Sequence, residues 1–299
     1  MNKIALITDS TSDVDSEMIQ KYNLQVLPLR IIYKDKEYID RVTITPKEVY
    51  DNFAYEIPST SLPSMNDMEE LYLKLEEEGY TQAIAVLISS NLSGTYNTFR
   101  LVSENHPSIE TCVFDSKSLT IGEAAIVEEC GEMIKSGLTF EEIVKTLPEI
   151  RSRITVYYAV DTLKYLIKGG RIGKVAGTIG EMLNLKPIIS INSDGVYYTY
   201  AKAKGKKKAT SKLVDIAREA LKETPCKIWV MHGGAYDEVK AFSDTIAGLQ
   251  NITRLSFGEI SPVAGVHTGP GLLGISIVKE PTSKILPKTE NTKELADEN

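Results

Sequence analysis

"QAIAVLISSNLSGTYNTF", residues 82–99, decides how the first half of this chain folds. An unbroken apolar run, residues 83–88, leads directly into a hydroxyl-rich segment with the composition of a helix start. A strand that is apolar at every position is buried on both faces, as in a parallel sheet covered by helices. The stretch therefore predicts a parallel strand over 82–89 and a helix that starts at Ser93, at the carboxyl edge of the sheet.

The same alternation of apolar and amphipathic segments continues on both sides of this stretch. Further strands are expected at 3–10, 24–33 and 111–116. Helices are expected at 16–23, 45–54 and 66–79, with two more before about residue 152. Buried strands separated by helices are typical of an α/β fold. Residues 1–152 are thus predicted to form a doubly wound α/β domain with a mostly parallel sheet.

The second half has a different pattern, which predicts a mixed α+β domain over residues 153–280. Asp194-Gly195 lies between two strand-like runs and is a hairpin signal. Other strands are expected at 154–160, 227–234, 252–260 and 272–280, and residues 162–174 read as a helix that ends in a glycine turn. The polar, aperiodic residues 281–299 are predicted to be a disordered tail.

Composition narrows the class of protein. The chain has 299 residues, of which 42% are hydrophobic and 25% charged, as in a globular protein. No long apolar run or signal-peptide pattern is visible, so a cytoplasmic location is expected. The net charge of −7 argues against nucleic acid as a partner. The three widely spaced cysteines are expected to be core residues rather than a disulfide framework or a zinc site.

Two hydroxyl-rich loops are candidate ligand sites. Ser93 is expected at a helix N-cap, where free N–H groups and the helix dipole favour an anion, and Gly94 allows close approach. "STSLPS", residues 59–64, contains Thr60 and Ser61 and adds a second group of neutral donors. The alternatives stay open at this point, because Ser93 could simply cap its own helix and residues 59–64 could be a polar linker.

"SPVAGVHTGPG", residues 261–271, supplies a third candidate in what reads as a loop before a strand. It contains His267, one of only three histidines in the chain. Neither a HExxH motif nor paired CxxC spacing occurs, so no metal site is predicted and His267 is interpreted as a hydrogen-bond donor. A histidine satisfied by its local backbone remains the alternative.

An enzymatic interpretation depends on Asp9 and Asp115, each at the end of a predicted strand. Such aspartates occur in metal-assisted phosphoester or acyl-transfer enzymes, but Asp9 is followed by Ser10 and Thr11 rather than by a second carboxylate. Capping of the next helix is the favoured role for both. No GxSxG, Walker or Rossmann pattern is present, so the sequence offers no nucleophile elbow and no nucleotide site.

The order and spacing of several motifs resemble the DegV family. The motifs are "TDSTSD", "TSLPS", "SSNLSGTYNT", "FDSKS", "LIKGGRIG", "LKPI" and "HTGPG", and the likeness runs from about residue 3 to residue 279. The resemblance implies two α/β domains with a long-chain fatty acid in a tunnel between them. It also implies no catalysis by this chain alone and no other cofactor, with the carboxylate presented to a separate catalytic subunit of a bacterial fatty acid kinase.

Carried over by position, the resemblance places the carboxylate anchors at Thr60, Ser93 and His267, with Arg171 nearby. Ser61, Gly94 and Thr268 are the expected supporting residues. Two positions depart from the family pattern, since Leu62 stands where an amide is common and Lys204 stands at or near a family arginine. Lysine keeps the charge but lacks the two-pronged geometry of arginine.

A run of lysines stands out in an otherwise acidic chain. It includes Lys204, Lys206, Lys207 and Lys208, at the end of the hairpin and the start of the following helix. Helix N-termini favour acidic side chains, so lysines gathered there suggest a purpose beyond helix formation. We hypothesise contact with an acidic face of the kinase subunit or with anionic lipid head groups, a solvated helix face being the alternative.

Overall fold

The computed structural model describes residues 3–181 and 185–281. Its first sheet is entirely parallel, in the order β2-β1-β6-β7. Its strands are β1 (Ile4–Asp9), β2 (Gln25–Leu27), β6 (Gln82–Leu87) and β7 (Glu110–Asp115). The central strand β6 is buried at all six positions, which confirms the predicted parallel sheet.

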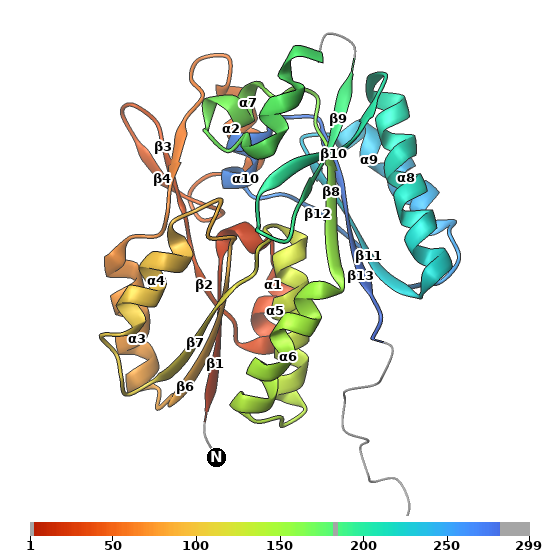
Figure 1. The fold of residues 1–299 in the computed structure, drawn as a ribbon. Helices are drawn as coiled ribbons and strands as arrows, with labels where there is room; N and C mark the ends of the chain where they lie inside the picture. Colours follow the sequence, from red (N-terminus) through yellow and green to blue (C-terminus); the bar gives the residue numbers. More distant parts are fainter. Residues whose placement is uncertain (1–2, 182–184, 282–299) are drawn as a thin grey trace, which may run out of the picture.

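Alternate residues of β6 enter two different cores, so the sheet is covered on both faces. Ala83, Ala85 and Leu87 pack with α3 (Met65–Glu77) and α4 (Thr95–Ser103). Ile84 and Val86 pack with residues of the helices on the other face. Those helices are α1 (Ser16–Tyr22), α5 (Ile121–Lys135) and α6 (Phe140–Ser152). Figure 1 shows the two layers of helices around this sheet.

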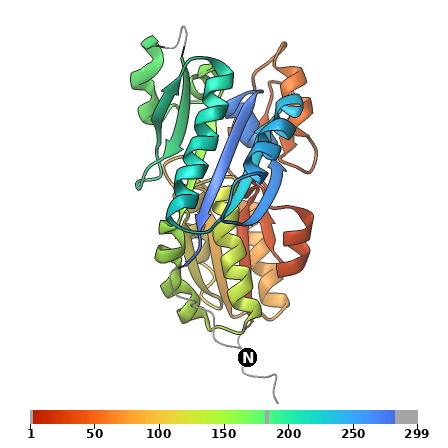
Figure 2. The ribbon, with the colours of Figure 1, turned by 90° about the vertical axis from the view of Figure 1, so that its right-hand side faces the viewer.

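The second sheet is mixed and has the order β10-β9-β8-β13-β11-β12, in which only the β11–β12 pair is parallel. Its strands are β8 (Ile154–Ala159), β9 (Lys186–Ile191), β10 (Tyr197–Ala203), β11 (Cys226–Gly233), β12 (Ile252–Glu259) and β13 (Leu272–Lys279). Helices α8 (Gly205–Glu223) and α9 (Tyr236–Ala247) cover its outer face (Figure 2). The mixed second part is as predicted, including the hairpin.

A small antiparallel sheet, β4-β3-β5, was not predicted. Its strands are β3 (Arg30–Ile32), β4 (Glu37–Ile39) and β5 (Ser59–Ser61). The strand expected over 24–33 is wrong as one element, because β2 and β3 belong to different sheets and are separated at Pro28. Likewise, the polar stretch 59–64 is not a plain linker, since its first three residues pair with β3.

Three short helices complete the fold near the junction of the two larger sheets. They are α2 (Pro46–Asn52), α7 (Lys164–Lys168) and α10 (Pro262–Thr268). The loop expected at 261–271 is therefore wrong. Ser261 caps α10 by accepting a hydrogen bond from the Ala264 N–H at 3.3 Å, and Pro262 fits the first helical turn. Val263 and Val266 of α10 join a small core with Leu29, Ile31 and Val49.

The remaining segments are short 3₁₀ helices, η1 (Ser10–Ser12) and η2 (Gly173–Glu181). The helix expected over 162–174 is shorter than predicted, because α7 ends at Lys168 and Gly170 has a φ of +70°. The domain boundary at 152/153 stays a prediction, and residues 282–299 of the expected tail lie outside the described residues. Within the described ranges, no helix is both long and apolar enough to span a membrane.

Candidate ligand-binding site

The loop after β6 presents Ser93 at the carboxyl edge of the parallel sheet. Ser93 is not the N-cap that was expected, because α4 begins at Thr95 and Gly94 occupies the cap position. Instead, the Ser93 Oγ accepts a hydrogen bond from the Thr95 N–H at 3.3 Å and lies 2.9 Å from the Thr95 hydroxyl oxygen. The Ser93 hydroxyl therefore stands just before the helix with hydrogen-bonding capacity to spare.

Two strand-end aspartates brace this loop. Asp9 accepts a hydrogen bond from the Ile88 N–H at 2.8 Å, and Asp115 accepts from the Ser90 N–H at 3.2 Å and from the Ser90 hydroxyl at 2.6 Å. Asp9 also caps η1, as predicted, whereas Asp115 caps no helix, because Thr120 is the N-cap of α5. Burial raises the pKa of Asp9. Both carboxylates thus serve to fix the loop that carries Ser93.

Thr60 comes from β5, the edge strand that pairs with β3. Its hydroxyl oxygen lies 2.7 Å from the Nε2 of His267, which joins two residues far apart in the sequence. Leu62 comes directly after β5, and its side chain lies against Gly94. A Cβ added at Gly94 would be 3.7 Å from the Leu62 Cδ2 atom. The apolar departure at Leu62 therefore contributes a packing contact at the edge of the site.

His267 is held on α10 in a half-buried position. The pKa of His267 is lowered to about 4, mainly by burial and also by the nearby positive charge of Arg171. The ring is therefore neutral at physiological pH. Its Nδ1 is buried and has no hydrogen-bond partner among the described residues. Gly169 backs this edge of the ring, because a Cβ built there would lie only 2.1 Å from Nδ1.

The N-terminal end of α10 is anchored by two buried acids of the first half. Asp13 accepts a hydrogen bond from the Ser261 N–H at 2.8 Å, and Asp40 accepts from the Val263 N–H at 3.0 Å. Burial raises the pKa of Asp40 to about 7. A negative or polar acceptor at a helix start satisfies free N–H groups. The helix that carries His267 is thus fixed by long-range bonds that sequence analysis did not anticipate.

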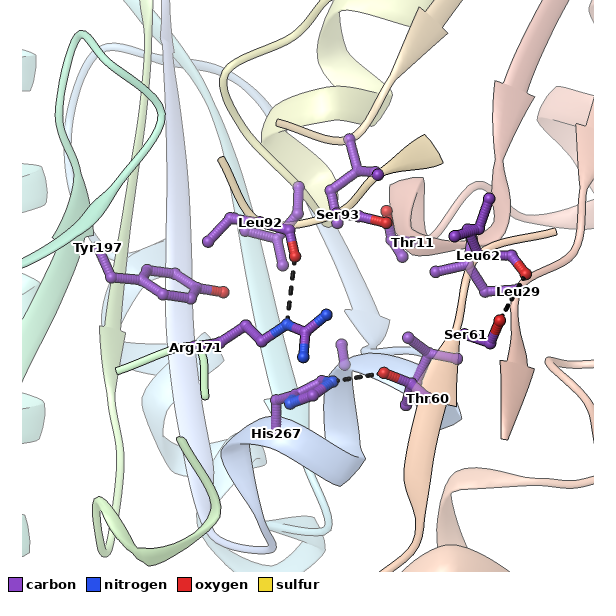
Figure 3. A pocket seen from close by; sticks show the side chains of 15 residues that line it. Thr11, Leu29, Thr60, Ser61, Leu62, Leu92, Ser93, Arg171, Tyr197 and His267 are labelled. Carbon is purple, nitrogen blue, oxygen red and sulfur yellow. Dashed lines mark hydrogen bonds between the residues drawn. The ribbon is translucent and has the colours of Figure 1, made fainter. Parts of the chain in front are cut away.

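Arg171 follows α7 and lies between the loop and α10. Its Nε donates a hydrogen bond to the Leu92 carbonyl at 3.3 Å, and its Nη1 donates to the Gly169 carbonyl at 2.7 Å. Figure 3 shows its guanidinium group between Leu92 and His267. The arginine ties the two halves together and places a positive charge beside the hydroxyls.

These side chains surround a cavity of about 200 Å³. Its lining residues are Thr11, Leu29, Thr60, Ser61, Leu62, Ile88, Leu92, Ser93, Gly94, Leu119, Arg171, Tyr197, Val263, Ala264 and His267. Figure 3 shows Thr60, Ser93 and His267 on three different segments, with Leu29, Leu62 and Leu92 nearby. Polar groups that converge in an apolar cavity are typical of a small-molecule binding site.

A second, apolar space adjoins the first but is almost closed, at about 10 Å³. It is lined by Leu119, Thr120, Tyr158, Val160, Leu166, Ile189, Tyr197, Ile260, Ala264, Thr268 and Leu272. The predicted supporting residue Thr268 thus lines this space rather than the first, and its hydroxyl donates to the Ala264 carbonyl at 3.0 Å.

The lysine run lines neither of these two spaces. Lys204 precedes α8, and Lys207 and Lys208 are exposed on its first turn. Lys206 instead pairs within the molecule, with Glu238 at 2.7 Å and Asp161 at 3.4 Å. Lys206 is therefore less suited to a partner contact than its neighbours. In residues 3–181 and 185–281, no cluster of three or more His, Cys, Asp or Glu side chains could hold a metal ion.

Sequence analysis missed several residues of the site. Tyr197 was read only as part of a strand, and Thr11 only as a follower of Asp9. The role of Asp13 and Asp40 could not be inferred from sequence spacing, because the N–H groups that they bind at the start of α10 lie more than 200 residues away in the chain. The stretch "TDSTSD", which contains Thr11 and Asp13, entered only as one of the motifs of the family resemblance.

Comparison with known proteins agrees with the architecture. A family model described as "Uncharacterised protein, DegV family" matches residues 3–280. A DegV domain-containing protein of Clostridium acetobutylicum is 67% identical over 280 residues, covering 94% of this chain and all of the relative.

Solved structures agree with this likeness. One, described as "Fatty Acid Binding of a DegV family Protein from Thermus thermophilus", has a TM-score of 0.88 and 27% identity, covering 93% of this chain and 100% of that one. Another, a stearic acid-binding protein from Eubacterium ventriosum, has a TM-score of 0.79 and 28% identity, covering 93% and 98%. On the match of the family model over nearly its whole length, this chain belongs to the DegV family.

Proposed function

We propose that this protein binds a long-chain fatty acid whose carboxylate is held by Thr60, Ser93 and His267. The observation that carries the proposal is the meeting of these three side chains, from three distant segments, in one cavity with apolar walls. The Thermus thermophilus and Eubacterium ventriosum relatives, both similar in fold over nearly the whole chain, are described as binding a fatty acid.

The polar end can bind an anion through neutral hydrogen-bond donors. The neutral ring of His267 can donate from Nε2 to the Thr60 oxygen, which leaves the Thr60 proton free for a carboxylate oxygen. Ser93 offers a second hydroxyl donor and Gly94 leaves room beside it. Arg171 adds a favourable positive charge, and Ser61 lies next to Thr60 on the same strand.

The apolar walls would supply most of the affinity. Burying each methylene group contributes about 0.8 kcal/mol, so a long acyl chain gains far more than a short one. Leaving the carboxylate oxygens unpaired inside the cavity would cost about 1–3 kcal/mol or more. The polar cluster therefore supplies orientation and selectivity for an acid, while the chain supplies binding strength.

The binding role extends to a partner. We propose that the protein performs no chemistry alone in the cytoplasm and presents the bound carboxylate to the catalytic subunit of a fatty acid kinase, with Lys204, Lys207 and Lys208 at a protein or lipid-surface contact. The absence of a nucleotide-binding motif from the sequence supports a separate ATP-using subunit. Acyl-phosphate formation from ATP should then require both proteins.

The partner contact can be tested separately from ligand binding. The double variant Lys207→Gln/Lys208→Gln should lower acyl-phosphate formation with the kinase subunit, or association with anionic vesicles, without loss of bound fatty acid. Lys222→Gln, near the opposite end of α8, is the matched control. Unchanged kinase coupling and unchanged vesicle association in the double variant would remove the lysines from the proposal.

Native mass spectrometry of protein purified without detergent tests the binding itself, followed by extraction and identification of any released acid. We expect one fatty acid per chain, and its loss in Ser93→Ala and His267→Ala. Ser211→Ala is the control, because that hydroxyl bonds only its own helix at 3.1 Å, far from the cavity. A wild-type protein that is empty and takes up no added fatty acid would refute the function.

A further inference from the structure

The two spaces described above meet at three residues. Leu119, Tyr197 and Ala264 line both the polar cavity and the apolar space. Because the two spaces share these residues, an acyl chain with its carboxylate at Thr60, Ser93 and His267 would enter the apolar space among these three side chains. We name this constriction, formed by Leu119, Tyr197 and Ala264, the neck.

The space beyond the neck is too small for an acyl chain as it stands. Its volume of about 10 Å³ compares with the 10–15 Å³, roughly, that a single water needs on this measure. Its lining residues lie on or beside β8, β9, β10, β12 and β13 of the second sheet, on α7 and α10, and just before α5, so both halves of the molecule enclose it. A chain that reaches it must displace at least one side chain.

Tyr197 is the largest of the neck residues and stands at the start of β10. Its ring is almost fully buried, with 5% of the residue exposed, and it projects from β10 toward the middle of the cavity (Figure 3). On the side of the apolar space it meets Tyr158 edge-on, with ring centroids 6.5 Å apart. The ring thus faces both spaces at once.

The backbone at Tyr197 cannot retreat easily. Gly173, at a φ of +53°, packs so closely that an added Cβ would lie 2.8 Å from the Tyr197 carbonyl oxygen. The strand also pairs with β9 through Tyr197 and Ile191. Rotation of the Tyr197 side chain is therefore the movement that can widen the neck with the backbone in place.

We propose that Tyr197 determines which acyl chains the protein accepts, by controlling how much of the chain passes the neck into the apolar space. This inference rests on the proposed function and deepens it. Acids short enough to stay within the polar cavity do not pass the neck, whereas long acids must move the Tyr197 ring. The side chain at position 197 should therefore change the affinity for long acids relative to short ones.

The test measures dissociation constants for stearic acid and for octanoic acid in wild type, Tyr197→Ala and Tyr197→Trp. Removing the ring should raise the preference for stearic acid about tenfold, which corresponds to two further buried methylenes. The larger indole should lower the same preference. Tyr200→Ala is the matched control, because Tyr200 lies on the same strand, is 45% exposed and lines neither space.

The outcomes separate the two proposals. If wild type binds neither acid, the proposed function itself fails. If wild type binds stearic acid but the ratio is the same in Tyr197→Ala and Tyr197→Trp, the neck assignment is wrong while the function stands. Circular dichroism and thermal melts check that each variant is folded, and Tyr197→Trp keeps the test open if Tyr197→Ala leaves too large a hole to fold.

Discussion

The polar end and the apolar end of the site are built in opposite ways. The polar end is fixed before any ligand arrives, since buried and partly buried hydrogen bonds hold the Ser93 loop through Asp9 and Asp115 and hold α10 through Asp13 and Asp40. The apolar end is a space of about 10 Å³ that side chains nearly fill. The difference teaches that the groups that select a head group can be held rigidly, whereas room for the acyl chain requires side chains to move.

The largest effect should come from releasing α10 at its start. Asp13→Ala removes the acceptor of the Ser261 N–H and the ion partner of Arg41, which lies 2.9 Å away. We expect the free energy of unfolding to fall by about 3 kcal/mol, because two polar groups lose their partner. Urea denaturation measures this. A fall of less than ~1 kcal/mol would mean that Asp13 contributes little to holding α10.

The pH dependence of stability should reveal the buried histidine. The pKa of His267 is lowered to about 4 in the fold, from an ordinary value of 6.5. Between these values the unfolded chain binds the extra proton, so the contribution of the neutral ring is complete above pH 6.5 and is lost as the pH falls through 4. The loss amounts to about 3 kcal/mol.

Wild type and His267→Gln should therefore be compared in urea at pH 7.5 and at pH 4.5. Asp40, whose raised pKa acts in the opposite direction, contributes to both proteins and cancels in the difference. The stability of wild type should decline more between the two pH values than that of the glutamine variant. Parallel declines would show that the ring is not buried in its neutral form.

Fatty-acid affinity should fall when the space behind His267 is filled. Gly169→Ala places a Cβ 2.1 Å from the Nδ1 atom, so the ring must leave its position beside Thr60. We expect affinity to drop about tenfold or more, equivalent to about 1.4 kcal/mol. Gly177→Ala is the control, because nothing lies within 4 Å of an added Cβ there. Isothermal titration calorimetry with stearic acid measures the affinity of each variant. Equal affinities of Gly169→Ala and wild type would show that His267 does not help to hold the carboxylate.

The smallest effect is expected at the apolar end. Ile189→Val removes one methylene from a wall of the almost closed space, and Ile189 is 1% exposed. The free energy of unfolding without ligand should fall by about 1 kcal/mol. Thermal denaturation tests this value. A much larger loss would show that this space is part of a rigid core and would weaken the contrast with the polar end.

Sequence patterns predicted the parts of the fold that depend on local composition. The apolar runs at 4–7 and 83–88 identified two of the parallel strands, and Asp194-Gly195 identified the hairpin. The strand at 59–61 was missed because its three hydroxyl residues have no apolar alternation, and its pairing with β3 is set by tertiary contact. Helix α10 was missed because it is short, contains Pro262 and Gly265, and is followed directly by Gly269, Pro270 and Gly271.

For the site, the hydroxyls and His267 could be singled out from composition and placed together by the family resemblance. What could not be predicted is the support behind them. Asp13 and Asp40 act across more than 200 residues, and Tyr197 occupies its place because of the register of β10 on β9. Such contacts depend on how two halves of a molecule approach each other, which no local pattern records.

Helix α10 has a consequence for communication within the molecule. His267 at the polar end and Ala264 at the neck are three residues apart on one short helix, so they move as one body. Because Asp13 and Asp40 hold the start of this helix, the spacing between the neck and the His267 ring is set by the fold. Under the proposed function, the helix that orients the head group would therefore also set how far from it the acyl chain meets the neck.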